Sequence, residues 1–173
     1  MKKILLVSAA LASSALIATG ASAATQSVSA GVNFISPLAI SNVVNANFGS
    51  VTAGVASTKY VLDTSGNVTV ASGPGIVVTG AKNAASFTIS GSSTQTINIS
   101  AGSYTANGGV TPSAATCKYG AGTAAACTAA AFSTAAAPAA GTTLAMGLTI
   151  TTTGNETGGT TANPSFTMTV VYN

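Results

Sequence analysis

Apolar side chains recur at every second position in several short stretches of this chain, and this spacing constrains its fold more than any other feature. Successive side chains of a β-strand point to opposite faces of the sheet, so a period of two marks a strand with one buried face. Threonine, whose β-branched side chain suits a pleated sheet, fills many of the alternating positions. The stretches are residues 26–40, 59–70, 85–89, 94–100, 144–150 and 166–172. They predict an all-β chain.

Turn residues separate these stretches at short intervals. Asp63-Thr-Ser-Gly-Asn67 joins two apolar runs as a hairpin turn, and Gly73-Pro74-Gly75 marks another turn. About seven to nine short strands, with turn signals every 8 to 12 residues, are typical of an antiparallel β-sandwich. The Ala-rich segment 123–140 is the exception, because its alanines favour a short helix while its threonines favour a surface loop. Both interpretations of that segment stay open.

The first 23 residues have the three parts of a secretory signal peptide. Met1-Lys2-Lys3 is positively charged, residues 4–17 are apolar, and Ala21-Ser22-Ala23 fits the small-residue cleavage rule. The apolar run is shorter than the roughly 20 residues that a membrane span needs. We therefore expect cleavage of residues 1–23, export, and no membrane span in the mature chain. Residues 24–173 would form a single domain with an N-terminal extension at about 24–36.

Very few side chains carry a charge. The sequence has five Lys and Arg residues, two acidic residues and no His, and charged residues make up 4% of it where about 25% is usual. Imidazole catalysis, His-based zinc sites and a basic surface for nucleic acid are thereby excluded. Asp63 and Glu156 are the only carboxylates for acid–base chemistry, and both stand in turn-rich sequence, where such residues bond their own backbone. We expect no enzymatic activity, no metal and no cofactor.

Cys117 and Cys127 are the only two cysteines and lie ten positions apart. An even number of cysteines in an exported chain favours a disulfide, here one that closes a local loop. Two free thiols or a redox pair are the alternatives, although the spacing is not Cys-x-x-Cys.

The stretch that follows the predicted cleavage site alternates apolar and polar or small residues. Its apolar positions are Val28, Ala30, Val32 and Phe34. Such a segment either closes an edge of the chain's own sheet or inserts as a donor strand into the sheet of a neighbouring subunit. Both uses exploit backbone pairing together with apolar anchors.

Two patterns resemble those of known exported proteins. Pro37-Leu38-Ala39-Ile40, followed by Asn47-Phe48-Gly49-Ser50-Val51 and Ala53-Gly54, resembles the Pro-Leu-x-Ile and Phe-Gly-x-Val pattern of one bacterial family. That family comprises small exported proteins and is known only as a domain of unknown function. Residues 166–173 are similar to its usual ending.

The layout is also similar to that of spore-coat-U-like and chaperone–usher pilin subunits, although pilins usually carry an early disulfide and both cysteines here are late. The resemblance implies an immunoglobulin-like, pilin-like sandwich that is exported through the periplasm. It would polymerise into a surface fibre by strand exchange with itself or related subunits. A periplasmic chaperone, acting with an usher, would grip the C-terminal strand at Phe166, Met168, Val170 and Tyr172. The alternative is a self-complete secreted or outer-surface binding or adhesion protein of unknown ligand.

Overall fold

A computed structural model describes residues 25–132, 135–136 and 139–173 of the chain. The described residues fall into two units, the short segment 25–33 and the compact unit 34–173. Residues 25–33 form no strand or helix, and their side chains are exposed. The predicted signal peptide, residues 1–23, lies outside the described residues.

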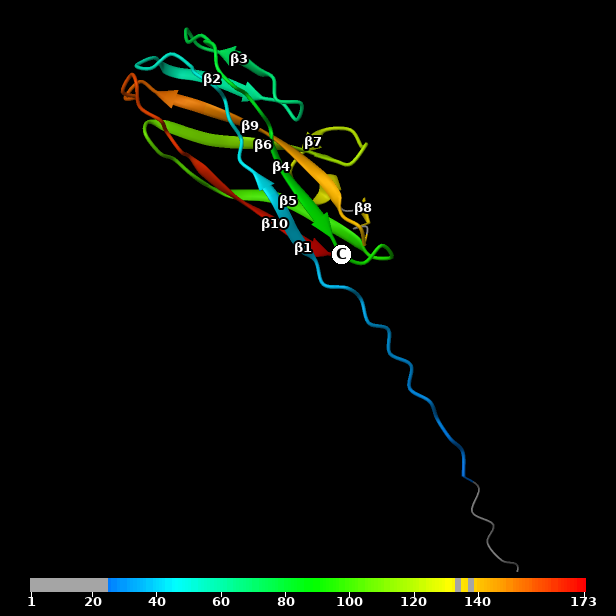
Figure 1. Ribbon diagram of the computed structural model, residues 1–173. Helices are drawn as coiled ribbons and strands as arrows, with labels where there is room; N and C mark the ends of the chain where they lie inside the picture. Colours follow the sequence, from blue (N-terminus) through cyan, green and yellow to red (C-terminus); the bar gives the residue numbers. More distant parts are fainter. Residues whose placement is uncertain (1–24, 133–134, 137–138) are drawn as a thin grey trace, which may run out of the picture. The chain divides into compact units, whose positions relative to one another are not determined.

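The compact unit is built from strands and short turns, which confirms the predicted all-β class (Figure 1). Among the described residues, eight strands have five or more residues, within the predicted range of seven to nine, and two more have two residues each. The elements are β1 (Ala39–Val44), β2 (Ala56–Leu62), β3 (Val68–Ser72), β4 (Ala85–Ser90), β5 (Thr96–Thr105), β6 (Val110–Tyr119), β7 (Ala125–Ala126), the 3-10 turn η1 (Ala129–Phe132), β8 (Ala135–Ala136), β9 (Thr142–Thr153) and β10 (Ser165–Tyr172).

The strands form two antiparallel sheets. In the large sheet the order is β1-β4-β9-β2-β3, and β6, which carries β7 on its other side, also pairs with β9. The twelve-residue β9 is central, because its first half pairs with β4, its second half with β2, and nearly its whole length with β6. The small sheet has the order β10-β5-β8. β1 and β10 therefore each lie at an edge of a sheet.

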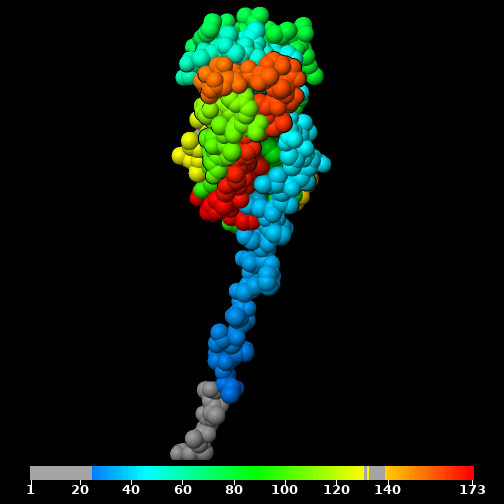
Figure 2. Space-filling view, turned by 90° about the vertical axis from the view of Figure 1, so that its left-hand side faces the viewer, coloured from blue at the N-terminus to red at the C-terminus, as the bar shows by residue number. Residues whose placement is uncertain are grey.

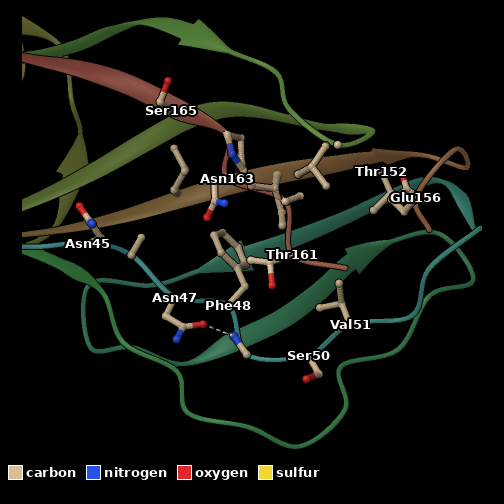
Figure 3. Close-up of a pocket in the computed structure, with 18 of the residues that line it drawn as sticks. Asn45, Asn47, Phe48, Ser50, Val51, Thr152, Glu156, Thr161, Asn163 and Ser165 are labelled. Carbon is tan, nitrogen blue, oxygen red and sulfur yellow. Dashed lines mark hydrogen bonds between the residues drawn. The ribbon is translucent and has the colours of Figure 1, made fainter. Parts of the chain in front are cut away.

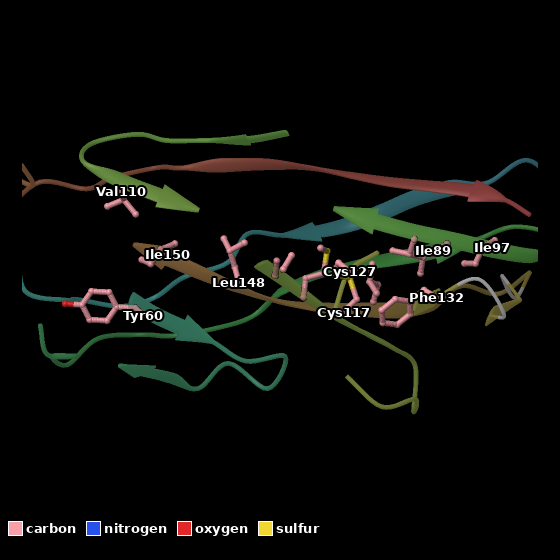
Figure 4. Close-up of a cluster of buried hydrophobic side chains, with 14 residues drawn as sticks. Tyr60, Ile89, Ile97, Val110, Cys117, Cys127, Phe132, Leu148 and Ile150 are labelled. Carbon is pink, nitrogen blue, oxygen red and sulfur yellow. A yellow bond between two sulfur atoms is a disulfide. The ribbon is translucent and has the colours of Figure 1, made fainter. Parts of the chain in front are cut away.

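One hydrophobic cluster joins the two sheets (Figure 4). Alternate residues of β9 enter it from the large sheet, and Ile97 and Ile99 of β5 enter it from the small sheet. Tyr60 lies fully buried towards one end, where its hydroxyl bonds that of Thr52 at 3.2 Å. Burial of a large aliphatic side chain stabilises the fold by about 1.5–3 kcal/mol. In β4, β5, β9 and β10 the alternation seen in the sequence thus corresponds to the face turned to this core, whereas β1 is exposed along its whole length.

The disulfide predicted between Cys117 and Cys127 is present, with Cα atoms 5.2 Å apart. Cys117 belongs to β6, and Cys127 follows β7 directly. Both side chains are buried in the hydrophobic cluster, beside Phe132 in Figure 4. The bond therefore fastens the Ala-rich segment to the core.

Two sequence interpretations need correction. The N-terminal strand predicted over residues 26–40, with an interruption at Ser36-Pro37, is wrong for residues 26–38, because β1 begins only at Ala39 and residues 25–38, all of which are described, have no strand partner. Alternation gives a segment the side-chain pattern of a strand, but a strand also needs a neighbour for its backbone groups. In the Ala-rich segment 123–140, the described part forms neither an α-helix nor a plain loop but β7, η1 and β8.

Four β-bulges each place a non-glycine residue in the left-handed region. The pairing shifts by one residue at Asn42 in β1, Ser57 in β2, Ser103 in β5 and Ala114 in β6, whose φ angles are 49°, 57°, 50° and 45°. Left-handed backbone costs an L-residue about 1–2 kcal/mol, and alanine has no side-chain hydrogen bond to offset that cost. Ala114 is therefore the bulge residue with the least compensation.

We expect Ala114→Gly to raise the free energy of unfolding by about 0.5–1 kcal/mol, because glycine adopts this conformation without strain. Urea denaturation of the two proteins measures the difference. Ala115→Gly is the control, since Ala115 is buried and has no positive φ. This variant should have a free energy of unfolding about 1 kcal/mol lower than that of the unmodified protein. Equal losses at both positions would contradict the assignment of strain to the bulge.

Candidate functional site

A groove of about 1170 Å³ lies in the compact unit, between residues 43–53 on one side and residues 156–168 on the other. Its first wall continues from β1, and its second wall leads into β10. The floor consists of side chains from the strands behind the walls, namely Ala85 and Phe87 of β4, Val110 of β6, and Leu148, Ile150 and Thr152 of β9. The groove thus opens onto the interior between the two sheets.

The groove is flanked by two sheet edges that have unused backbone groups. Within the described part of the chain, β1 pairs only with β4, and β10 pairs only with β5. Figure 2 looks towards this side of the compact unit, where the red surface of β10 and the cyan surface of residues 40–53 lie beside each other with a hollow between them. Residues 37–53 and 157–171 are all described, and no hydrogen bond joins the two segments across the hollow. An edge strand of this kind is a template for another strand.

The walls carry large apolar side chains that are only partly covered. Phe48 and Val51 on one wall, and Phe166 and Met168 on the other, are partly buried against the core. In Figure 3 the Phe48 ring points across the groove towards Thr161 and Asn163. The Phe48 turn is shaped by Asn47, whose side-chain oxygen accepts a hydrogen bond of 2.8 Å from the Gly49 amide. The groove is therefore apolar at its base, with amide and hydroxyl groups along its rims.

Glu156 closes the end of the groove at which the two walls meet. Its Oε1 accepts hydrogen bonds from the backbone amides of Thr153 (2.7 Å) and Gly154 (3.1 Å) on its own wall. Its Oε2 accepts a hydrogen bond of 3.2 Å from the backbone amide of Gly54, the residue that directly follows the opposite wall. We call this contact the Glu156 tie. Glu156 is also the only ionisable side chain among the groove-lining residues, all of which are described.

The Glu156 tie depends on a charged carboxylate. Desolvation raises the pKa of the Glu156 carboxyl, but backbone amides, those of Thr153, Gly154 and Gly54 among them, donate to it and hold the pKa below its ordinary value. A lowered pKa means that the folded state binds this proton less readily than the unfolded state. The stability from the tie is therefore present above the ordinary pKa of glutamate and is lost as the pH falls through the lowered value.

A second contact joins the two edges beyond the other end of the groove. The Tyr172 hydroxyl, at the end of β10, donates to the carbonyl of Ser36 at 2.6 Å and accepts from the amide of Ser92 at 2.6 Å. Ser36 lies three residues before β1. This contact fixes the start of the first edge to the end of the second.

The predicted donor residues are exposed and unused in the single chain. Val28 is 90% exposed, Val32 68% and Phe34 94%, and Ala30 is exposed as well. Val28, Ala30 and Val32 belong to the segment 25–33, and Phe34 begins the compact unit. Isolated exposed apolar residues are common, but an alternating series of them in one unpaired segment is a feature of interaction sites.

The predicted C-terminal residues are split between two places. Phe166, Met168, Val170 and Tyr172 all lie on the face of β10 that is turned inward and pack against the core. Phe166 and Met168 line the groove, whereas Val170 and Tyr172 lie beyond it. No sequence pattern indicates that Phe48 and Val51, or the loop 157–163, would lie opposite β10, because only the tertiary fold brings them there.

Asp63, the other carboxylate considered for acid–base chemistry, is engaged in hydrogen bonds within its own turn. The Asp63 carboxylate accepts hydrogen bonds of 2.8 Å from the amides of Ser65 and Asn67, as expected for a turn residue. Desolvation raises the pKa of Asp63, but these bonds and one from the Asn67 side chain hold the pKa below its ordinary value. In the part of the chain that the structure describes, no group of three or more His, Cys, Asp or Glu side chains could hold a metal ion.

No known protein family, curated protein or solved structure matches the chain. Within the described ranges, no helix is both long and apolar enough to span a membrane.

Proposed function

We propose that this chain is a structural subunit of an exported bacterial surface fibre, an immunoglobulin-like, pilin-like sandwich that lacks one strand and receives it from a neighbouring copy. Its guest is the segment around Val28 to Phe34 of that copy, and its host is the groove between β1 and β10. The observation that carries the proposal is an apolar groove between two free sheet edges in a chain that also carries an unpaired alternating segment. Related subunits could serve as donors by the same chemistry.

Backbone geometry supports a strand as the guest. Among the described residues, β1 and β10 each have one edge without a strand partner, and both reach the groove, β1 at Val43 and Val44 and β10 at its first residues. An inserted strand could pair with these edges. A small-molecule ligand would leave these backbone groups unpaired. The alternating pattern of the segment also fits, because every second side chain of the guest would point to the apolar floor while the others faced solvent.

The low charge of the chain supports assembly rather than catalysis. Without Lys2 and Lys3 of the predicted signal peptide, three lysines and two acids leave little repulsion between stacked subunits. The one carboxylate in the groove is held by backbone amides and has no second ionisable side chain beside it among the lining residues. We accordingly propose a non-enzymatic role that needs no cofactor. A periplasmic chaperone and an usher, which would hold β10 before assembly, belong to the same proposal.

A self-complete exported binding protein is the second candidate. The Tyr172–Ser36 contact favours it, because it places the end of the extension, at Ser36, beside the end of β10. A reversal at Ser36-Pro37 would then let residues 25–35 run back along their own edge strands. In that case the protein would be a monomer with a filled groove.

A peptide experiment distinguishes the two candidates. We expect a chain that lacks residues 25–36 to bind a synthetic peptide of that sequence, and its melting temperature to rise. A peptide at about 100 times its dissociation constant adds about 2.7 kcal/mol to the free energy of unfolding, which raises the melting temperature by about 8 °C for a domain of this size. A peptide of the same composition without the alternation is the control. The intact chain should form oligomers on size exclusion at high concentration.

The fibre proposal fails if the truncated chain folds, gains nothing from the peptide, and the intact chain stays monomeric. If the peptide stabilises the truncated chain but the intact chain is a monomer at every concentration, the self-complete candidate is correct.

A further inference from the structure

We infer that Glu156 is a stop at one end of the groove, which is the strand site of the proposed function. It would thereby fix the register in which a guest strand lies there. This inference rests on the proposed function, because it concerns how the guest is positioned. It assigns to the single acidic residue of the groove a role in specificity that the sequence does not indicate.

The position of Glu156 supports a stop. The residues that line the groove end at Ala53 on one wall and begin at Glu156 on the other. The Glu156 tie joins these two ends through the amide of Gly54. In Figure 3 Glu156 lies at one end of the site, next to Thr152. A guest that moved past this point would have to break the tie.

The chemistry of Glu156 makes passage unfavourable. Both carboxylate oxygens already accept hydrogen bonds from backbone amides, one on each side of the groove. An apolar side chain pushed against them would desolvate the charge and offer no donor in return. A carboxylate bonded to both walls is therefore a barrier to apolar anchors as well as a mechanical link.

Register needs such a stop because alternation alone does not define it. A shift by one residue would turn the apolar side chains of the guest away from the floor, but a shift by two restores the same face. The guest has four apolar positions at a spacing of two, namely Val28, Ala30, Val32 and Phe34. Registers that differ by two residues are therefore close in energy unless one end of the site is closed.

Photochemical cross-linking tests this inference with the full chain. A synthetic peptide of residues 25–36 carries benzoylphenylalanine in place of Phe34 and is added in excess, and mass spectrometry locates the cross-linked acceptor positions. We expect one dominant position in the unmodified chain and at least two positions, two residues apart, in the Glu156→Ala variant. Glu156→Gln, which keeps an acceptor but loses the charge, should give an intermediate distribution.

Asp63→Ala is the matched control. It also removes a turn carboxylate bonded to backbone amides, but Asp63 does not line the groove, so the cross-link should stay at one position. Hydrogen exchange checks the tie itself, since the Gly54 amide should exchange faster in Glu156→Ala than in the unmodified chain or Asp63→Ala.

The outcomes separate this inference from the function on which it rests. A single cross-link position in Glu156→Ala overturns the inference and leaves the strand site intact. Unchanged exchange at Gly54 in that variant also overturns it. If the peptide cross-links to the groove in none of the proteins, the proposed function fails and the inference fails with it.

Discussion

Replacement of Phe34 by aspartate is expected to abolish assembly of the chain without lowering its melting temperature as a monomer. Phe34 is 94% exposed in the single chain, so its removal costs the folded monomer almost nothing. In the proposed assembly the ring is an anchor in the groove of a neighbour, where burial is worth about 1.5–3 kcal/mol. Burial of the new charge adds a further penalty, so affinity should fall about 100-fold or more.

Two variants serve as controls for Phe34→Asp. Asn33→Asp introduces the same charge one residue away, on the opposite side of an extended strand, and should still assemble. Phe34→Leu keeps an apolar anchor and should weaken assembly only moderately. Analytical ultracentrifugation at several concentrations measures the effect. If Phe34→Asp destabilises the monomer instead, the extension fills the groove of its own chain. If it assembles like the unmodified protein, Phe34 is not an anchor.

Removal of the disulfide by Cys117→Ala with Cys127→Ala is expected to lower the free energy of unfolding by about 3 kcal/mol. The disulfide closes a loop whose ends are ten residues apart, which lowers the conformational entropy of the unfolded chain and stabilises the folded state by about that amount. The two side chains are also buried, so their truncation leaves part of the core unfilled. For a domain whose total stability is typically about 5–15 kcal/mol, this is a large loss. Urea denaturation of oxidised protein measures it.

The matched control for the disulfide changes two exposed residues of the same loop. Ala121→Ser with Ala124→Ser leaves the bond in place and should stay within about 0.5 kcal/mol of the unmodified protein. Reduction of the unmodified protein in urea should reproduce most of the loss. A cysteine-free variant within about 1 kcal/mol of the unmodified protein would show that strand pairing alone holds the Ala-rich segment.

Strands whose alternation runs without a break were predictable, whereas β6, in which a bulge interrupts the alternation, was not. Leu144, Met146, Leu148 and Ile150 alternate without a break, and all four are buried in β9. In β6 the inward side is Val110 and Pro112 before the bulge at Ala114, and Ala115 and Cys117 after it. The extra residue changes the phase of the pattern, so a search for a period of two does not find this strand.

The candidate site was predictable only in part. The sequence pattern identifies the alternating segment with Val28 and Phe34 and the alternation of β10, and the structure adds that the first is exposed and that the second faces inward. The second wall at Phe48 and Val51, and the Glu156 tie, do not. Gly54 and Glu156 are 102 residues apart in the chain, and no local pattern indicates that they meet.

The sequence by itself determined the all-β class, the disulfide and the scarcity of chemical groups, because each depends on side-chain spacing or on which residues are present. Only the tertiary structure decided that β1 and β10, the strands at two sheet edges, would flank one groove with no strand between them. The physical reason is that pairing partners are chosen by the whole fold: β9 takes three neighbours while β1 and β10 are left with one each. A strand's pattern records which face is buried and not which edge remains free.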